Sequence, residues 1–362
     1  MYEKEMKEIR IAIVDTLSLH SNGKIFGHFE KVAIQYYDIL NSKFDVTIMG
    51  GSAYSVDNRK FTQLPCDICK IDFDSASKVR KIINKLKAVI NIIAALLSDN
   101  EALIFQDCNQ SVLYMLLRFY RGKKKIFLIK YNIETRNKTD KLLYNLKNHV
   151  AGVITNLESV AKHYRFENYV IVPDYFPMNA IDAKEKKIYD FVCLGTVIDS
   201  KDYEDVTTAI SKSKRYTLKI AGYFKDKKRY SKLLKYENER ISIEDKYLSD
   251  EEYDYLIKSS KYVVLPYKAK GYNNRSSGVV LDSVYKGTPV ICSNLEAFRF
   301  VKEYTLGIVY KDGFHNALQD VKTVDYSKLC NNILEWVDLK NKDKERLLNF
   351  VYAATLNGEV HA

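Results

Sequence analysis

The sequence lacks a regular cysteine framework. It has six cysteines in 362 residues, and the CxxC pair Cys66 and Cys69 has no second pair to complete it. A structural zinc site needs about four ligands, and His20 and His28 are poor candidates for the missing ones. The pattern therefore disfavours zinc and redox chemistry, and it favours the reduced thiols typical of cytoplasmic proteins.

Long hydrophobic runs are also missing. The longest apolar stretch, Ala88–Leu97, contains Asn91 and is far shorter than the roughly 20 residues that a membrane-spanning helix needs. The first 14 residues contain acidic side chains and too short an apolar run for a signal peptide. We therefore expect a cytoplasmic protein, which could also lie peripherally on the inner face of the cell membrane.

Hydrophobic residues make up 46% of the chain and charged residues 28%, a balance typical of globular proteins. The formal net charge is +11, and residues 1–180 hold 26 Lys and Arg against 19 Asp and Glu. This bias suits a membrane surface, a nucleic acid or a phosphate-bearing substrate, or it is simply a solvated surface. Nucleic acid ranks last, because no nucleic-acid-binding module is present.

Short β-branched runs alternate with helical patterns along the chain. Such alternation predicts a parallel sheet with helices on both faces, and a 362-residue chain favours two domains. The polar segment Asp174–Lys187, which contains Pro177, is predicted to be the linker. The predicted strands are Arg10–Val14, Val46–Met49, Ala102–Gln106, Ile126–Ile129, Gly152–Thr155 and Tyr169–Val172, then Asp190–Leu194, Thr217–Ala221, Tyr262–Leu265 and Pro289–Cys292.

We therefore predict an α/β protein of two Rossmann-like lobes whose parallel sheets face each other across a cleft. Residues 1–176 form the N-terminal lobe, and residues 188–335 form the C-terminal lobe. Residues 336–362 are predicted to be helices that pack back towards the N-terminal lobe. In such sheets ligands bind at the carboxyl ends of the strands.

The segment Val263–Cys292 contains the most informative candidate binding residues. A buried strand runs into a polar loop, and Ser276, Ser277 and Gly278 then open a helix. Backbone N–H groups at a helix start, together with the helix dipole, suit a diphosphate. Arg275 could clamp phosphate oxygens, and Asp282 could accept hydrogen bonds from a ribose. The alternative is an ordinary loop, N-cap and core helix.

This segment resembles the nucleotide-sugar signature of glycosyltransferase family 4, in which two glutamates flank seven residues and a G-x-P follows. Aligned on Gly287 and Pro289, the second glutamate falls on Asp282 and the first on Asn274. The resemblance implies a GT-B fold, donor binding, and contact between Asn274 and the transferred sugar. A subset of such enzymes carries S-G-x-x-L-D, which this sequence matches.

The resemblance extends through the C-terminal half. Phe191–Lys201 is similar to the family's strand, glycine and lysine, with Gly195 and Lys201 in place and Thr196 where the family has arginine. The resemblance implies that Lys201 and Arg275 bind the donor phosphates and act in catalysis. Tyr216–Gly222 is similar to the family's next strand, which ends at Gly222. Ile241–Leu265 is similar to the family's base-binding stretch, and the resemblance implies that Tyr247 borders the nucleobase.

The N-terminal half resembles the family loosely. The stretch Asn22–His28 would be the glycine-rich loop near the acceptor, or else a plain turn; its candidate residues are Gly23, Gly27 and His28. In Leu128–Glu134, a tyrosine replaces the family's histidine, and Asn132 and Glu134 remain. The family is thought to retain anomeric configuration without a protein base. An inverting enzyme would need a carboxylate base, for which Asp107 and Glu134 are the candidates.

An amphipathic helix is predicted over Ser77–Leu97, and a basic aromatic cluster follows at Arg118–Lys125. Both could lie on an anionic membrane, or the helix could be a core helix with its lysines outside. The apolar stripe is Val79, Ile82, Ile83, Leu86, Ile90, Ile93 and Leu97, flanked by Lys78, Lys81 and Lys85 on one side and by Arg80 and Lys87 on the other.

The sequence thus predicts a retaining glycosyltransferase that uses a UDP or GDP sugar, needs no metal or other cofactor, and acts on a glycan or lipid-linked acceptor in cell-surface polysaccharide or glycolipid synthesis. Its single D-x-D, Asp72–Asp74, is interpreted as a solvated loop. The alternatives are a non-catalytic partner subunit of the same fold and a GT-B nucleotide-sugar epimerase.

Overall fold

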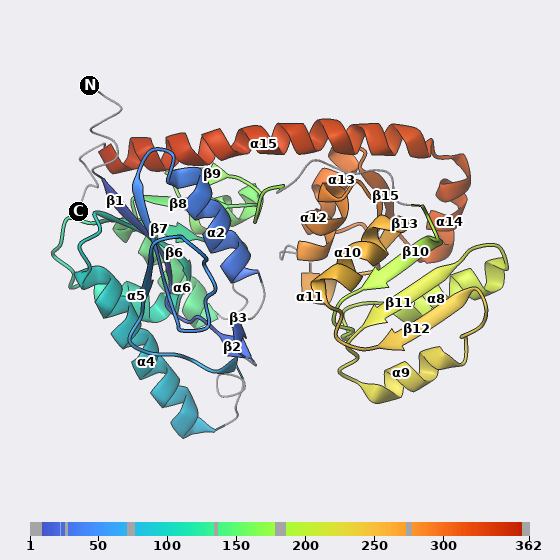
Figure 1. Cartoon of the computed structure of the whole chain (residues 1–362), viewed down its shortest axis with the longest axis horizontal. Helices are drawn as coiled ribbons and strands as arrows, with labels where there is room; N and C mark the ends of the chain where they lie inside the picture. The colour runs from blue at the N-terminus through green and yellow to red at the C-terminus, as the bar shows by residue number, and fades with distance from the viewer. Residues whose placement is uncertain are drawn as a thin grey trace. The chain divides into compact units, whose positions relative to one another are not determined.

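The computed structural model describes residues 9–21, 23–25, 28–70, 77–133, 137–177, 186–272 and 277–356. The chain divides into two compact units (Figure 1). Unit 1 comprises Met1–Phe176 and Lys342–Ala362, and unit 2 comprises Pro177–Asn341. Each unit is built around a single parallel sheet.

The sheet of unit 1 has seven strands in the order β5-β4-β1-β6-β7-β8-β9, and all of its pairings are parallel. Its strands are β1 (Arg10–Asp15), β4 (Asp45–Gly50), β5 (Phe61–Gln63), β6 (Ala102–Asp107), β7 (Lys125–Ile129), β8 (Gly152–Thr155) and β9 (Tyr169–Ile171). Its helices are α2 (Phe29–Leu40), α4 (Lys78–Leu97), α5 (Gln110–Leu117), α6 (Asn137–Leu146), η1 (Lys147–His149) and α7 (Glu158–Tyr164).

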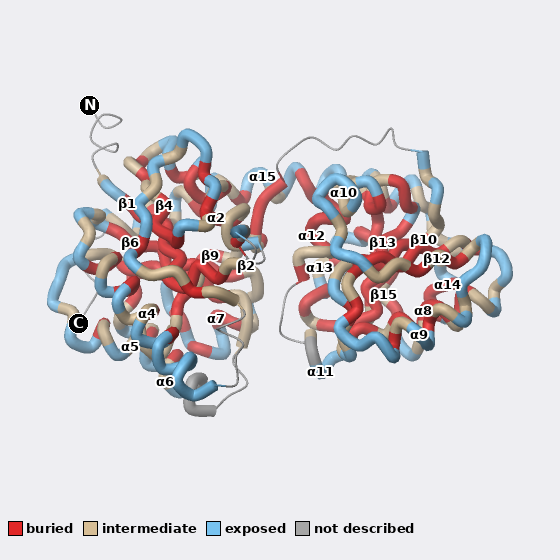
Figure 2. The backbone as a smooth tube through the Cα atoms, turned by 60° about the horizontal axis from the view of Figure 1, so that its bottom comes forward, coloured by how far each residue is buried: buried red, intermediate tan, exposed pale blue. Residues whose placement is uncertain are grey.

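The strands of unit 1 are buried because their side chains are apolar on both faces, as parallel sheets covered by helices require. On one face, Ala12 and Val14 of β1 join a core with residues of α4, α5, α6 and α7. On the other face, the ring of Phe127 packs edge-on against Phe350 of the C-terminal helix. Figure 2 shows the strands buried at the centre of the unit and exposed residues over its helices.

The sheet of unit 2 has six strands in the order β12-β11-β10-β13-β14-β15, also all parallel. Its strands are β10 (Tyr189–Leu194), β11 (Leu218–Gly222), β12 (Ile241–Asp245), β13 (Ser260–Leu265), β14 (Val290–Ser293) and β15 (Gly307–Tyr310). Its helices are α8 (Tyr203–Ser213), α9 (Lys227–Leu234), α10 (Asp250–Lys258), α11 (Ala269–Tyr272), α12 (Gly278–Tyr285), η2 (Glu296–Phe298), α13 (Arg299–Glu303) and α14 (Phe314–Thr323).

The C-terminal stretch is one continuous helix, α15 (Tyr326–Leu356), where the sequence predicted several. Its first half belongs to unit 2, where Leu329 joins the core, and residues from Lys342 onwards belong to unit 1. No proline or glycine interrupts it over its length, so nothing in the local sequence breaks the helix.

The predicted fold class is confirmed, because each unit is a parallel α/β sheet. The prediction missed the short pair β2 (His20–Ser21) and β3 (Lys24–Ile25) and three strands of the parallel sheets, β5, β12 and β15, which all lie at sheet edges. The half-exposed edge strands β5 and β12 lack the continuous apolar run by which the central strands are recognised, whereas β15, Gly-Ile-Val-Tyr, has such a run and was overlooked. The helix predicted over Ser77–Leu97 is present as α4. It packs on the core through other residues, among them Ile92 and Leu96, while the predicted apolar stripe is exposed, so the alternative in which that stripe enters the core is wrong.

Within the described residues, no helix combines the length and hydropathy needed to cross a bilayer.

Candidate functional site

The carboxyl ends of the strands in unit 2 contain the predicted donor residues. The chain runs outwards from β10 through β11 to β12 and then returns to place β13 on the other side of β10. This reversal makes the carboxyl ends of β10 and β13 the topological switch point, where ligands of open α/β sheets bind. Gly195 follows β10 directly, and Tyr267 lies two residues after β13.

Lys201 returns to this switch point from the loop that follows β10. Its backbone forms an antiparallel bridge with Tyr267, and its Nζ lies 5.1 Å from the centre of the Tyr267 ring. The same Nζ donates to the carbonyl of Leu194 at 3.5 Å, and a Cβ placed on Gly195 would lie 3.6 Å from it. The side chain is only 4% exposed, so a cation is held inside the protein at the end of the central strand.

Burial lowers the pKa of Lys201 from 10.5 to about 8, because the charged ammonium loses its hydration. The described residues place no carboxylate against Nζ, so the ammonium is compensated here by carbonyl oxygen and an aromatic face. An anion bound at the switch point would stabilise the charged form of Lys201 and raise its pKa, because a nearby negative charge favours the protonated lysine.

The loop that carries Lys201 is fixed by neighbouring side chains. Arg229 of α9 donates to the carbonyl of Ile198 at 2.6 Å and to the carbonyl of Lys201. The hydroxyl of Tyr203 donates to the carbonyl of Leu194 at 3.0 Å. The sequence did not single out Arg229 or Tyr203, because their partners lie on other elements. Together they hold the loop in place without any bound ligand.

Two predicted glycines, Gly195 and Gly222, meet at the ends of β10 and β11. Gly195 has φ +85°, a left-handed conformation that favours glycine. A Cβ on the buried Gly222 would lie 2.0 Å from the Gly195 carbonyl oxygen, so only glycine fits there. Gly222 therefore allows the two strand ends to approach, and the exposed Thr196 lies beside them at the surface.

The helix predicted after the polar loop is α12, which begins at Gly278 with Ser277 as its N-cap. The Ser277 side chain makes no capping hydrogen bond, and its Oγ lies 3.3 Å from the hydroxyl of Tyr267 instead. This contact joins the start of α12 to the loop after β13. Asn274, Arg275 and Ser276 lie outside the described residues, so their donor-binding roles stay predictions.

Asp282, the expected ribose ligand, is buried within α12. Its carboxylate accepts a hydrogen bond from the hydroxyl of Tyr253 on α10 at 3.2 Å. That bond raises the pKa of Tyr253 well above its usual value, together with the larger effect of burial. Asp282 is therefore already engaged in a contact between helices α10 and α12.

Tyr247 presents an aromatic surface after β12. Its ring is 76% exposed and stacks on Tyr223, with ring centres 4.4 Å apart and planes 12° apart. Lys227 lies over the Tyr223 ring at 4.7 Å and also donates to Asp245 at 2.5 Å. A flat, supported and solvent-facing ring of this kind suits stacking by a nucleobase.

A second group of polar side chains occupies the switch point of unit 1, between β1 and β6. Asp15 ends β1 and is paired with Asp107, which ends β6. The two oxygens of Asp15 accept from the backbone N–H of Ser18 and from the hydroxyl of Tyr54, each at 2.7 Å. Burial raises the pKa of Asp15 to about 6, and burial together with Asp15 raises the pKa of Asp107 well above its usual value.

A buried lysine and an amide complete this edge of unit 1. Lys130, directly after β7, donates to Gln110 at 3.2 Å and to Asn132 at 2.9 Å. Gln106 donates to Tyr54 at 3.0 Å, and its buried oxygen has no partner among the described residues. The sequence analysis named Asp107 and Asn132 and missed Asp15, Tyr54 and Lys130. A charged residue directly after a buried apolar run was the available signal.

The other predicted acceptor residues are spread over unit 1. Gly23, with φ +73°, lies in the turn between β2 (His20–Ser21) and β3 (Lys24–Ile25), a small antiparallel hairpin in place of an open loop. His28 is the N-cap residue of α2, and its ring lies 5.6 Å from that of Tyr175. Gly27 and Glu134 lie outside the described residues.

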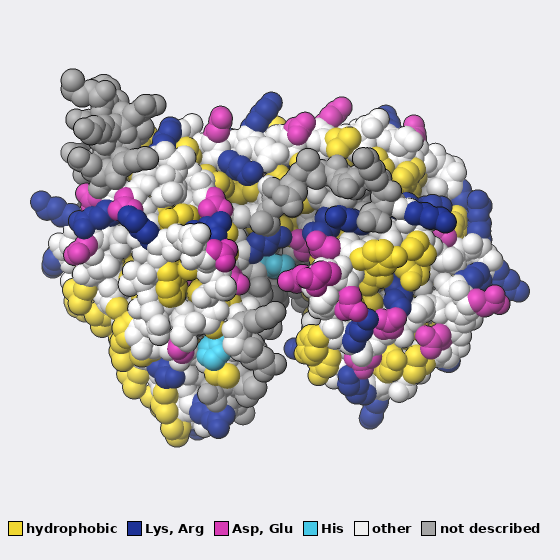
Figure 3. All heavy atoms as spheres, viewed as in Figure 1, with side chains coloured by type: hydrophobic (Ala, Val, Ile, Leu, Met, Phe, Trp, Pro, Cys, Tyr) yellow, Lys and Arg dark blue, Asp and Glu magenta, His cyan; other side chains and the backbone are white. Residues whose placement is uncertain are grey.

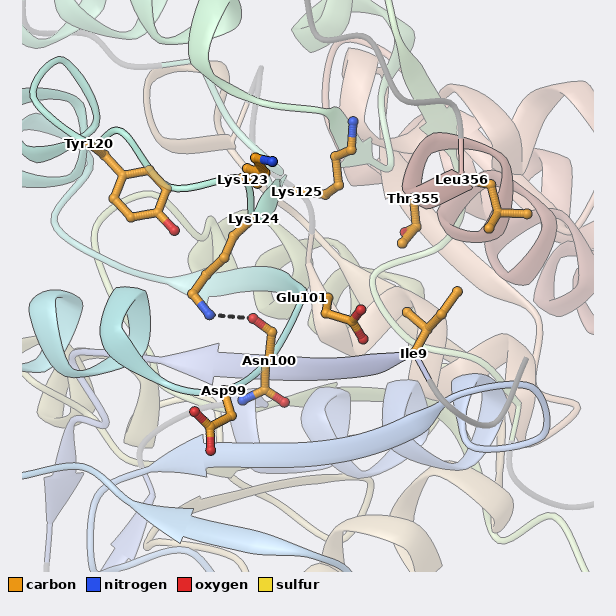
Figure 4. A pocket seen from close by; sticks show the side chains of 10 residues that line it. All are labelled: Ile9, Asp99, Asn100, Glu101, Tyr120, Lys123, Lys124, Lys125, Thr355 and Leu356. Carbon is orange, nitrogen blue, oxygen red and sulfur yellow. Dashed lines mark hydrogen bonds between the residues drawn. The ribbon is translucent and has the colours of Figure 1, made fainter. Parts of the chain in front are cut away.

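A cavity of about 580 Å³ lies at the opposite end of the unit 1 sheet (Figure 4). Its lining comes from the segments before β1, β6 and β7, including Ile9, Glu101 and Lys124, and from the end of α15. Figure 4 shows Lys124 directed at the carbonyl of Asn100, so its ammonium is used within the protein. Because ligands of parallel sheets bind at the carboxyl ends, this cavity is not the candidate site.

The described residues contain no group of three or more His, Cys, Asp and Glu side chains placed to hold a metal ion. The D-x-D of Asp72–Asp74 lies outside them. All six cysteines are free thiols, including Cys66 and Cys69.

No protein-family model matches the chain, and no curated protein sequence matches it significantly. Its fold matches solved structures. Sucrose-phosphate synthase from Thermosynechococcus elongatus matches with a TM-score of 0.69 at 14% identity, over 96% of this chain and 100% of that one. The Anabaena protein HepE in complex with UDP and glucose matches with a TM-score of 0.65 at 11% identity, over 95% and 100% of the two chains.

AviGT4, a glycosyltransferase involved in avilamycin A biosynthesis, matches with a TM-score of 0.61 at 11% identity, over 94% of this chain and 98% of that one. These similarities show that the chain has the GT-B fold of glycosyltransferases. The expected fold is confirmed, and membership of glycosyltransferase family 4 in particular stays a prediction.

Proposed function

We propose that the chain is a glycosyltransferase that moves a sugar from a nucleoside diphosphate sugar, bound by unit 2, to a hydroxyl group of an acceptor. The observation that carries the proposal is the buried Lys201 ammonium beside Gly195 at the switch point of unit 2. The GT-B fold supports the same reading, because several of its solved members are glycosyltransferases or bind UDP.

In this proposal Lys201 stabilises the leaving diphosphate. The bond between the anomeric carbon and the phosphate oxygen breaks, and negative charge develops on the phosphate that leaves. A desolvated ammonium, fixed in place before the reaction, stabilises that charge far more than a solvated one would. The start of α12 at Gly278 adds the positive end of a helix dipole, and Arg275 is proposed to add a second cation.

Tyr247 and Asp282 are proposed to bind the nucleoside. The exposed ring of Tyr247 offers a stacking surface for the base, and the Asp282 carboxylate, which already accepts from Tyr253, is proposed to accept from a ribose hydroxyl as well. Uracil is the first base to test, since HepE was solved with UDP and a trehalose-6-phosphate structure from E. coli with UDP-2-fluoro glucose. GDP sugars are the second.

We propose a retaining, metal-independent reaction. The acceptor oxygen forms its new bond on the face from which the diphosphate departs, and its proton passes to an oxygen of the leaving phosphate. Unit 1 would bind the acceptor at the carboxyl ends of β1 and β6, where the partly exposed Asp107 would contact its hydroxyl groups. Asp107 would act as the base if the enzyme inverts instead.

A glycan or lipid-linked acceptor is proposed, with a role in cell-surface polysaccharide or glycolipid synthesis. The support is the excess of positive charge in residues 1–180, which suits acceptors that carry phosphate or lie on an anionic surface.

The test is a thermal-shift panel of nucleoside diphosphates and nucleotide sugars, applied to wild type, Lys201→Met and Lys212→Met. Lys212 is an exposed lysine of α8 and serves as the matched control. A ligand at 100 times its Kd stabilises the folded protein by about 2.7 kcal/mol, which is a clear rise in Tm. We expect one nucleotide to stabilise wild type and the control, and to stabilise Lys201→Met much less.

Catalysis is then tested by release of the nucleoside diphosphate from the stabilising nucleotide sugar in the presence of candidate acceptors. Nucleotide binding without any release would favour the non-catalytic partner subunit. Absence of binding by every nucleotide would contradict the proposal as a whole.

A further inference from the structure

Helix α4 is turned with its large apolar side chains away from the protein. The described part of the chain has 16 exposed large hydrophobic residues, and seven of them lie on this helix with exposed fractions from 38% to 77%. Their spacing follows a single helical face. Figure 3 shows the hydrophobic side chains as a band along the outer edge of unit 1, over α4. They are Val79, Ile82, Ile83, Leu86, Ile90, Ile93 and Leu97.

The opposite face of α4 fixes this orientation. That face buries the small and polar residues Ala88, Asn91 and Ala95 together with Ile92 and Leu96, which join the core of unit 1. The Asn91 side chain donates to the carbonyls of Thr16 and Cys66 at 2.9 and 2.8 Å and accepts from the Cys66 N–H at 3.0 Å. Rotating the helix to bury its apolar stripe would break all three bonds and bury lysines, so the exposed stripe is built into the packing of α4.

The charges on α4 have one sign. The helix carries five basic residues and no acidic one, and Lys78, Lys81 and Lys85 are exposed along one flank of the stripe. Beside α4 packs α5, which is followed by the exposed residues Arg118 and Phe119. An apolar stripe bordered by cations is the arrangement of helices that lie in the interface of an anionic bilayer, with lysine ammonium groups at the level of the lipid phosphates.

We propose that the outward face of α4 docks the protein on an anionic lipid membrane. The apolar stripe enters the boundary between headgroups and acyl chains, while the flanking lysines contact lipid phosphates. A second copy of this chain fits less well, because pairing the same faces would bring two sets of five cations together. This inference does not depend on sugar transfer.

The test is cosedimentation of the full chain with vesicles of phosphatidylcholine alone and with vesicles that contain 30 mol% phosphatidylglycerol, a composition of about one anionic lipid in three. We expect binding to the anionic vesicles that weakens as salt is added, and much weaker binding to the neutral ones. The double substitution Lys81→Gln/Lys85→Gln should weaken binding roughly 25-fold, because each basic residue near the surface contributes about fivefold.

The double substitution Ile82→Gln/Leu86→Gln should weaken binding at least about tenfold, because two buried aliphatic side chains are lost from the bilayer. The matched control is Leu334→Gln/Leu339→Gln, which makes the same change at exposed positions of α15. All four positions are exposed, so both variants should keep the wild-type Tm, which is measured first.

Four results would overturn the proposal. Wild type could bind neither kind of vesicle, or it could bind them equally well. The α4 apolar variant could bind as strongly as the α15 control, which would place the contact elsewhere. Light scattering could show a wild-type dimer that the α4 variant converts to a monomer without any vesicle binding, and the face would then be an interface between copies of the chain.

Discussion

Replacing Lys201 by methionine removes a buried cation while keeping most of the side chain's volume. The pKa of this lysine is lowered from 10.5 to about 8 in the folded protein, because the side chain is buried. If a diphosphate binds beside it, the ammonium gains a counter-charge and stays protonated well above pH 8. Binding of the nucleotide must then take up a proton, and the affinity must depend on pH.

The size of this dependence follows from the fraction of lysine that is protonated before binding. With a pKa of about 8, that fraction falls from roughly nine-tenths at pH 7 to roughly one-tenth at pH 9, so Kd should rise about tenfold over this range. At pH 8 binding should take up about half a proton. Isothermal titration in two buffers with different ionisation enthalpies measures that uptake, using the nucleotide that the thermal-shift panel identifies.

The same pKa shift has a second consequence, for stability. The pKa of Lys201 is about 8 in the folded protein and 10.5 in the unfolded chain, so below pH 8 folding must bury a charged ammonium and is opposed. As the pH rises from about 8 to 10.5, the folded protein loses this charge first, and the free energy of unfolding increases. A shift of this size costs roughly 3 kcal/mol at pH 7. Lys201→Met should therefore be more stable than wild type in urea unfolding at pH 7, by up to this amount, while binding nucleotide poorly.

Two results would refute this reasoning. One is a Kd that changes with pH equally in wild type and in Lys201→Met, since the dependence would then come from the nucleotide itself. The other is a Lys201→Met variant that is less stable than wild type at pH 7, since the lysine would then be a packing residue and not a strained cation.

Three further predictions concern other residues of the two sheets. Gly222→Ala should lower the free energy of unfolding, measured in urea, by roughly 1–3 kcal/mol, because the added Cβ would meet the Gly195 carbonyl oxygen. Gly23 has open space around it, so Gly23→Ala should lower the free energy of unfolding by only about 1 kcal/mol, from backbone strain alone. Asp15→Asn should raise the free energy of unfolding by roughly 2 kcal/mol at pH 7.5 and leave it unchanged near pH 4. The reason is that the Asp15 carboxyl, whose pKa is raised to about 6, opposes folding only once it ionises. An equal effect at both pH values would contradict this account. Tyr247→Ala should weaken nucleotide binding by roughly 1–3 kcal/mol in titration calorimetry without lowering Tm, since the ring is 76% exposed, and a lower Tm with unchanged Kd would assign the ring to packing.

The central strands could be predicted from the sequence because each is a run of apolar residues buried on both faces. The strand Ala102–Gln106, predicted from its run of apolar residues, is found as β6, one residue longer. The edge strand β9 was also found in this way, as Tyr169–Val172, but the edge strand β5 could not be. In β5 the side chains are partly or fully exposed, so its sequence, Phe-Thr-Gln, carries no apolar signal.

The candidate site was predictable where one local segment carries it. Lys201 follows Gly195 in the same loop, so a sequence pattern could point to both. The cluster of Asp15, Asp107 and Tyr54 was not predictable, because its members come from segments 39 to 92 positions apart and meet only through the order of the strands. Long-range juxtaposition of this kind is set by topology and not by local pattern.

Helix α4 shows a different limit of sequence patterns. Periodicity predicted its length and its apolar face correctly, but a periodic pattern does not say whether that face meets the protein or its surroundings. The deciding residue is Asn91, whose three hydrogen bonds turn the polar face inwards. A buried asparagine in the middle of a helix therefore decides which face is covered.

Unit 1 is assembled from two stretches of chain that are separated by the whole of unit 2. Phe350 of α15 packs on Phe127, and Tyr352 packs on Phe44, so residues made late in synthesis complete a core begun early. On the ribosome, unit 2 can therefore finish folding first, while the face of the unit 1 sheet that α2 and α15 share is covered by α2 alone. In the cell, chaperones that shield apolar surface would be needed during that interval, and slow or interrupted translation after unit 2 would prolong it.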